Sequence, residues 1–195
     1  MKLRGLHEFL DIYFNFGNAL NSRIDKELYL SIRDALKVIC RSVEKGNLEI
    51  IEEACGNEKT SRATIKLLKN FNKLMYAKYR NSFNRLQFCN IEIKISKGEL
   101  NTNRRGIKIP FFCFIDNKTL EVIILAFSSL SSGSVAKEAE VLKGLLNEFD
   151  LDKSLPKEIK KITYWELNSC REISLDYNKV KAVSKASLVE AVSNI

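Results

Sequence analysis

Few side chains of this sequence have the types and the spacing that metal binding or acid–base catalysis requires. The only histidine, His7, stands four residues before Asp11, so the two would share one face of a helix. An imidazole in that place could be a metal ligand or a general base. One imidazole without partner acids near the hairpin at 107–129 makes no site, which favours a helix-surface or a buried, hydrogen-bonded histidine. Glu92 and Lys94 flank Ile93 as an acid–x–lysine motif. Because polar residues that alternate along a strand normally face solvent, we interpret this motif as a chance match.

The most regular spacing in the sequence belongs to cations. One row has intervals of three and four residues and consists of Lys59, Arg62, Lys66, Lys69, Lys73, Tyr76 and Arg80. On a helix with 3.6 residues per turn these side chains share one edge. A row of like charges repels itself, and a phosphate backbone would relieve that repulsion and release counterions, while Tyr76 could stack on a base. The alternative is a solvated lysine-rich face that serves solubility.

The charge of the chain is concentrated around this row. The segment 59–108 holds thirteen Lys or Arg and two acids, a net charge of +11. Because the whole chain carries +8, the remainder sums to −3. A second basic group, Arg104, Arg105 and Lys108, follows the row. This concentration favours a polyanionic partner, and among polyanions nucleic acid.

The periodicity of apolar residues predicts the elements that would position these groups. A length of 195 residues fits one domain, or one domain with an appendage. Helical periodicity predicts helices over 3–20, 25–45, 47–55, 60–79, 135–149 and 178–192, with Thr60 or Ser61 as a cap of the fourth. Alternation and apolar runs predict strands over 86–96, 107–115, 120–127, 159–167 and 172–175, with a turn at 116–119 and a loop at 128–134. The run 120–127 is almost wholly apolar, which is typical of a strand covered on both faces. The order predicts an α/β fold with a central mixed sheet of about five strands flanked by helices.

A Gly followed by His-Glu, at Gly5, His7 and Glu8, stands before this order of elements: strand, core hairpin at 107–129, linking helix and two late strands. The whole resembles the RecB-like branch of the PD-(D/E)xK nucleases. The resemblance implies one restriction-endonuclease-like domain over 1–195. Its parts would be a helical N-terminal region at 1–83, a sheet core with linking helix at 84–177 and a C-terminal helix at 178–195.

In that family the hairpin supplies an Asp, then an acid and a Lys two residues apart, which hold a divalent metal and orient water. Laid on this sequence, Pro110 matches the Pro of the motif, Phe111 the Asp, Leu125 the acid and Phe127 the Lys. Apolar side chains cannot ligate a hard cation. The resemblance therefore implies a nuclease fold that lacks its catalytic groups, and it moves the expected function to the basic row. In the family the region just before the hairpin faces the nucleic-acid cleft, so the resemblance also implies that the row and the second basic group line one groove.

Three functional hypotheses follow. The leading one is a catalytically inactive nuclease-fold protein without a cofactor that binds nucleic acid through the basic face, as an accessory to DNA replication, repair or defence. The first alternative is an active nuclease that uses Mg²⁺ or Mn²⁺ with relocated residues, for which His7, Glu8, Glu92 and Lys94 are the candidates. The second is a non-catalytic scaffold for a protein partner in a DNA-processing complex.

The five cysteines show no CxxC spacing, so zinc or iron–sulfur ligation is disfavoured and small core hydrophobes are expected. No apolar run approaches the roughly 20 residues of a membrane span. The charged N-terminal segment has no secretory signal pattern, which favours a cytoplasmic protein.

Overall fold

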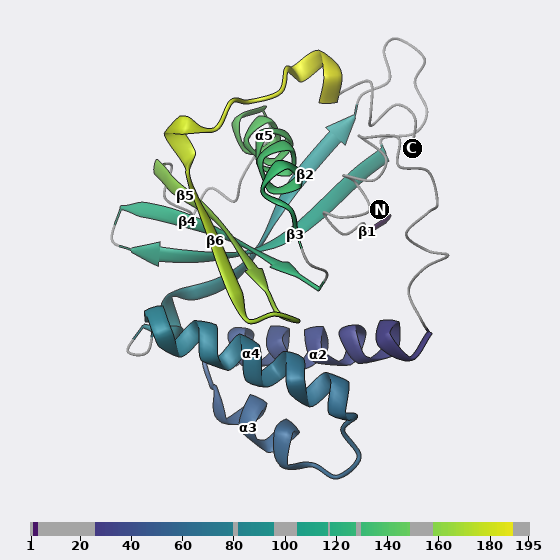
Figure 1. Ribbon diagram of the computed structural model, residues 1–195. Coiled ribbons are helices and arrows are strands. Elements are labelled where there is room, and N and C mark those ends of the chain that lie inside the picture. Colours follow the sequence, from purple (N-terminus) through teal and green to yellow (C-terminus); the bar gives the residue numbers. More distant parts are fainter. Residues whose placement is uncertain are drawn as a thin grey trace.

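The computed structural model describes residues 2–3, 26–79, 82–95, 105–116, 118–127, 130–148 and 158–188 (Figure 1). Its helices are α2 (Lys26–Lys45), α3 (Glu49–Gly56), α4 (Arg62–Tyr79) and α5 (Ser132–Glu148), with 3-10 turns η1 (Phe83–Arg85) and η2 (Tyr177–Lys179). Its strands are β1 (Lys2–Leu3), β2 (Leu86–Ile95), β3 (Arg105–Asp116), β4 (Thr119–Ala126), β5 (Glu158–Glu166) and β6 (Arg171–Asp176).

The strands form one mixed sheet in the order β1-β3-β4-β5-β6, with β2 paired to β3 as well. Pairing is antiparallel for β2–β3, β3–β4 and β5–β6, and parallel for β4–β5 and β1–β3. The predicted α/β fold, a central mixed sheet flanked by helices with a helical region near the N-terminus, is confirmed. The described sheet has six strands rather than about five, because the two residues of β1 also pair with β3.

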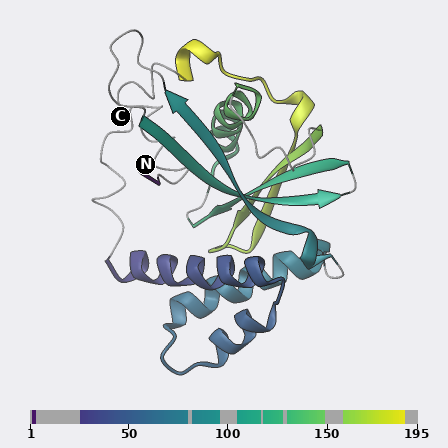
Figure 2. The same ribbon diagram turned by 180° about the vertical axis from the view of Figure 1, so that it is seen from behind.

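Helices cover both faces of the sheet (Figures 1 and 2). Helix α5 lies on one face, α2 and α4 lie on the other, and α3 packs outside them. Strand β4 contributes to a core on each side: Leu120, Val122 and Ile124 pack in the α5-side core, and Ile123 and Leu125 pack in the core formed with α2 and α4. The expectation that this apolar strand is covered on both faces is confirmed.

Helix α4 has the local sequence features that start a helix and bury one side of it. The Ser61 hydroxyl oxygen accepts a hydrogen bond from the backbone N–H of Thr64 at 3.1 Å, so Ser61 is the predicted cap. The buried edge of α4 includes Leu67, Phe71 and Met75. Burying this edge in the core fixes which edge of the helix faces solvent.

The C-terminal segment differs from the helix predicted over 178–192. The structure has η2, then a stretch without regular structure, then one helical turn at 185–188, and the rest lies outside the described residues. Tertiary hydrogen bonds explain the difference. Lys143 donates from Nζ to the carbonyls of Tyr177 at 2.7 Å and Val180 at 2.8 Å, and the N–H of Val183 donates to the carbonyl of Glu140 at 3.2 Å. These bonds hold the segment along α5 in a conformation that is not a continuous helix.

Two other boundaries differ from prediction. Leu3 belongs to β1, which pairs with β3 in parallel, and not to a helix, because pairing satisfies backbone groups at the edge of β3. The predicted loop at 128–134 ends earlier, since α5 begins at Ser132 with the Ser131 hydroxyl accepting from the N–H of Ser134 at 3.1 Å.

Candidate nucleic-acid interface

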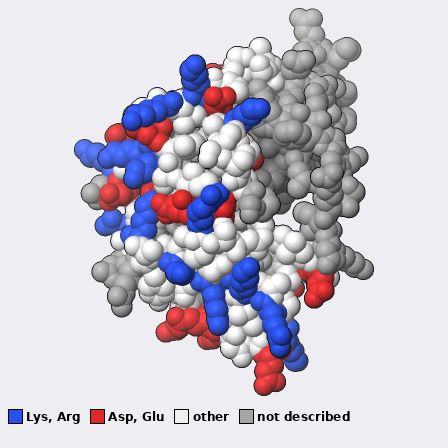
Figure 3. All heavy atoms as spheres, in the orientation of Figure 1, with Lys and Arg blue, Asp and Glu red and all other residues white. Residues whose placement is uncertain are grey.

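The basic row occupies the solvent-facing edge of α4 and the residues just before it. Lys59, Arg62, Lys66, Lys69 and Lys73 are exposed, and the Tyr76 side chain is 39% exposed. Figure 3 shows Lys and Arg side chains gathered over α4 on the face that carries this helix at the front. Arg80, the last residue of the predicted row, lies outside the described residues. The structure therefore brings six of the seven predicted residues to one surface.

This row is not neutralised by neighbouring acids. Helix α4 carries five Lys or Arg and no Asp or Glu. Within the described ranges, no carboxylate lies within 4.0 Å of Lys59, Arg62, Lys66, Lys69 or Lys73. These five side chains therefore do not contribute to the fold through ion pairs with described carboxylates, and exposed ion pairs would stabilise it little in any case. Their charge is available to an external anion.

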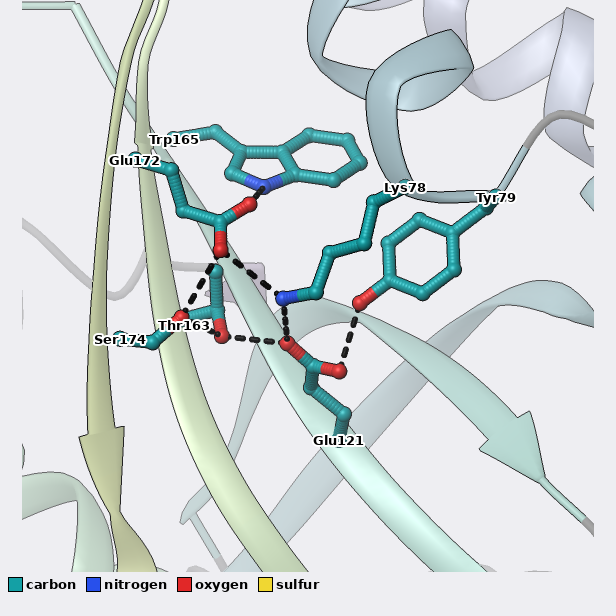
Figure 4. Close-up of polar contacts among 7 residues, drawn as sticks. All are labelled: Lys78, Tyr79, Glu121, Thr163, Trp165, Glu172 and Ser174. Carbon is teal, nitrogen blue, oxygen red and sulfur yellow. Dashed lines mark hydrogen bonds and ion pairs between the residues drawn. The ribbon is translucent and has the colours of Figure 1, made fainter.

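Lys78, the last cation of α4, is in a different environment (Figure 4). Its Nζ lies 2.9 Å from Oε1 of Glu121 on β4 and 2.9 Å from Oε1 of Glu172 on β6. The neighbouring Tyr79 hydroxyl donates to Oε2 of Glu121 at 2.6 Å, and Thr163 on β5 donates to Oε1 of Glu121 at 2.5 Å. We call the seven residues that Figure 4 labels the Lys78 cluster; it fastens the last turn of α4 to three strands.

The Glu121 carboxylate of the Lys78 cluster is held in its charged form. Burial alone would raise the pKa of Glu121, but hydrogen bonds from Thr163, Tyr79 and Lys78 outweigh it and lower that pKa below its ordinary value. Burial alone would lower the pKa of Lys78, and its bonds to Glu172 and Glu121 raise it instead. The Glu172 carboxylate also accepts from the Trp165 indole N–H at 3.1 Å. The polar atoms named here are mutually satisfied, so the cluster has the properties of a structural anchor.

The structure does not join the second basic group to the row. Arg104 lies outside the described residues, and only the backbone of Arg105 and Lys108 is described. They occupy register positions opposite Ile95 and Glu92. In both ribbon views the start of β3 lies at the upper end of the sheet and α4 lies beneath it (Figures 1 and 2). The backbone positions of Arg105 and Lys108 therefore lie toward the end of β3 that is away from α4, and the groove shared by both groups stays a prediction.

The apolar positions of the nuclease-like motif are core positions. Phe111 is 2% exposed and packs in the α5-side core, whereas Leu125 is 7% exposed and packs in the core under α2 and α4, where Phe127 is also half-buried. Residues opposite each other in an antiparallel pair share a face, and the register pairs Phe112 with Ile123. Phe111 and Leu125 therefore project from opposite faces of the sheet. These residues do not fit a divalent metal, and the three positions do not face one site.

The remaining catalytic candidates do not form a site in the described part of the chain. Glu92 and Lys94 lie on β2 as predicted, with their side chains undescribed, and His7 and Glu8 lie outside the described residues. Among the described residues no three His, Cys, Asp or Glu side chains converge in a way that could hold a metal ion.

A second polar cluster, which the sequence did not reveal, joins the end of β5 to the start of α5. The Glu166 carboxylate is 1% exposed and accepts from Arg171 at 2.6 Å, from the Ser169 hydroxyl at 2.6 Å and from the N–H of Leu130 at 2.7 Å. The hydrogen bond from Arg171 lowers the pKa of Glu166 to about 2 despite burial. Its partners lie three to thirty-six residues away along the chain, so spacing alone could not have indicated it.

No protein-family model, no curated protein and no solved structure matches this chain. Among the described residues, no helix combines the length and the apolar character needed to cross a membrane.

Proposed function

We propose that this protein binds nucleic acid through the basic row on α4 without cleaving it, in an accessory role in DNA replication, repair or defence. The observation that carries the proposal is that cations on or next to α4 differ in whether a carboxylate neutralises them. Five cations of the row are exposed and lie beyond 4.0 Å of any described carboxylate, whereas the neighbouring Lys78 is held by two. A row of unneutralised cations with an exposed tyrosine at its end suits a phosphate backbone with a base stacked on the ring.

The embedding of α4 favours contact with the backbone over reading of base sequence. One edge of α4 is buried against the sheet, and α2 and α3 pack beside it. A helix that reads bases must enter the major groove, which is about 12 Å wide, with much of its circumference free. Only the outer edge of α4 is available, so its contacts are those of a surface that tracks phosphates. We infer binding that depends on salt and not on sequence.

A charge-reversal experiment tests the proposal. Lys66→Glu with Lys69→Glu changes two exposed residues of the row, and we expect at least a tenfold loss of affinity for a fluorescent DNA or RNA oligonucleotide at low salt. The matched control is Lys179→Glu with Lys181→Glu, which changes net charge equally at two exposed positions of the C-terminal segment. Equal losses in both variants, or no binding by the unaltered protein in low salt, would contradict a site on α4.

One observation favours a second candidate, the metal-dependent nuclease with relocated residues. Glu121, Glu172 and Lys78 bring two acids and a lysine together beside the hairpin. Incubation of labelled DNA and RNA with Mg²⁺ or Mn²⁺ separates the two functions. Binding without product supports our proposal, and cleavage that Glu121→Gln abolishes would establish the nuclease instead. The third hypothesis is a protein-interaction scaffold. It would be favoured if the folded protein bound neither DNA nor RNA in these assays.

A further inference from the structure

Two cysteines far apart in the sequence meet in the α5-side core. Cys89 lies on β2 and Cys113 on β3, both are buried, and their Sγ atoms are 2.7 Å apart. The strand register pairs Cys89 with Phe111 and Gln87 with Cys113, so the two thiols are diagonal neighbours on one face of the antiparallel pair. The other three cysteines, Cys40, Cys55 and Cys170, are half-buried in other parts of the molecule.

The two sulfur atoms would have to move only a short distance toward each other to form a disulfide bond. A disulfide bond is about 2.05 Å long, so closure requires an approach of roughly 0.7 Å. Diagonal neighbours in an antiparallel pair are typically about 7–8 Å apart, but the two Sγ atoms of this pair are already in contact. In the described sheet, β2 pairs with β3 alone, which lets it shift to accommodate the bond. The backbone therefore already holds the thiols where an intramolecular bond competes well with an intermolecular one.

We infer that Cys89 and Cys113 are a modification site, an oxidisable dithiol that forms a disulfide between β2 and β3. The co-reactant is a low-molecular-weight disulfide such as oxidised glutathione. The thiolate of one cysteine attacks a sulfur of that disulfide, forms a mixed disulfide and releases one small thiol. The second cysteine then attacks the protein sulfur of the mixed disulfide, the Cys89–Cys113 bond forms and the second small thiol leaves. Two protein thiols are oxidised, one small disulfide is reduced to two thiols, and the two thiol protons pass to the departing thiolates.

Burial determines how this site behaves. The contact with Cys89 and burial raise the pKa of the Cys113 thiol, so little thiolate is present at neutral pH and oxidation is slow. The same burial shields the disulfide from reductants once it has formed. The site is therefore a staple for prolonged oxidising conditions and not a rapid sensor. This inference is independent of the proposed nucleic-acid binding.

The bond would close the chain between Cys89 and Cys113, residues separated by 24 positions. Restricting the unfolded chain over a loop of that length stabilises the folded state, and we expect a rise in Tm on the order of 5 to 10 °C.

The test uses the full chain with Cys40→Ser, Cys55→Ser and Cys170→Ser, which leaves only the pair. After prolonged incubation with oxidised glutathione, we expect denatured thiols to fall from two to zero, the mass to fall by about 2 Da and Tm to rise, with no disulfide-linked dimer formed. Dithiothreitol should reverse the changes in thiol count, mass and Tm. Two persistent thiols, a lasting glutathione adduct or a disulfide-linked dimer would each overturn the inference.

The unaltered protein provides a second test should the triple variant fail to fold. After the same oxidation, alkylation in denaturant and proteolysis, the inference requires a peptide that joins Cys89 to Cys113. Recovery of both residues alkylated, or of either joined to another cysteine, would overturn it.

Discussion

Lys73 and Lys78 belong to the same helix and differ in what surrounds them. Lys73 lies beyond 4.0 Å of every described carboxylate, whereas the Nζ of Lys78 lies 2.9 Å from a carboxylate oxygen of Glu121 and 2.9 Å from one of Glu172. A cation that already neutralises two carboxylates has little charge left for a phosphate. The structure therefore assigns different tasks to two lysines that a count of charges would treat as equal.

This difference gives a prediction for a matched pair of variants. Lys78→Met leaves two partly buried carboxylates without their cation, and we expect a loss of about 1–3 kcal/mol in the free energy of unfolding, below the cost for a fully buried pair because solvent screens the charges. Lys73→Met should change stability by less than about 0.5 kcal/mol. Urea denaturation measures both, and similar costs in the two variants would contradict the anchoring role of the Lys78 cluster.

Glu166 gives a prediction about pH. Its folded-state pKa is lowered to about 2 from an ordinary value of 4.5, so the stability it contributes is present above pH 4.5 and is lost as the pH falls toward 2. Glu166→Gln keeps the shape but loses the charge that Arg171 pairs with, and we expect a cost of about 1.5–3 kcal/mol at pH 7. The Tm difference from the unaltered protein should narrow between pH 4.5 and pH 2. A difference that stays constant over that range would contradict ionisation as its origin.

The candidate site could be predicted from the sequence only where its residues are near one another in the chain. The basic row follows from helical spacing, and the structure confirms that its described members on α4 share an exposed edge, whereas Lys59 precedes the helix. Glu121 and Glu172 are 43 and 94 residues from Lys78, and no periodicity connects them. The contact of Cys89 with Cys113 likewise depends on the strand register, which the sequence does not specify. Sequence spacing can therefore predict a site whose residues lie on one helix, but not a site formed when strands that are distant in the sequence pair with each other.

At the scale of elements, the contact between α5 and the C-terminal segment depends on a glycine. A Cβ on Gly144 would lie 2.7 Å from Cγ2 and 3.0 Å from the backbone oxygen of Val183. Replacement of glycine by alanine inside a helix normally stabilises by up to about 1 kcal/mol. At Gly144 the backbone of the C-terminal segment would have to move before that gain could be realised.

We therefore expect Gly144→Ala to destabilise the protein by about 1–3 kcal/mol, as overpacking does in a filled core. The control is Gly133→Ala in the same helix, where an added Cβ meets nothing within 4 Å and we expect no loss and a gain of at most about 1 kcal/mol. Thermal denaturation should move Tm in opposite directions in the two variants. A rise in Tm for Gly144→Ala would show that the C-terminal segment does not pack on α5 as described.

The same segment shows where element prediction fails. Strands β2 to β6 and helices α2 to α5 follow from alternation, apolar runs and helical periodicity, with ends that differ by a few residues. The segment after β6 has a helical sequence pattern, but Lys143 and Glu140 on α5 bind its backbone in another conformation. Tertiary hydrogen bonds to a neighbouring helix outweigh a modest helical preference.

At the scale of the whole molecule, the arrangement separates a charged edge from two apolar cores. The sheet has a core on each face, and Phe111, Leu125 and Phe127, the positions compared with a nuclease motif, are distributed between these cores. The row lies on the outer edge of a helix that the second core holds in place. The fold therefore provides a rigid support for a line of positive charge, and binding should depend on how many cations meet phosphates.

The salt dependence of binding measures that number. Five described cations of the row, each neutralising one phosphate, predict that log Kobs falls against log salt concentration with a slope of about −4.5 for duplex DNA or about −3.5 for a single strand. Lys66→Gln with Lys69→Gln should reduce the magnitude of the slope by about 1.8 or 1.4 respectively, and Lys179→Gln with Lys181→Gln should leave it unchanged. Fluorescence anisotropy across a range of salt concentrations provides the slopes. A slope near zero would exclude phosphate contacts as the basis of binding. An unaltered slope in the Lys66 and Lys69 variant would place the contacts away from α4, because removing two cations that touch phosphates must reduce the number of counterions released.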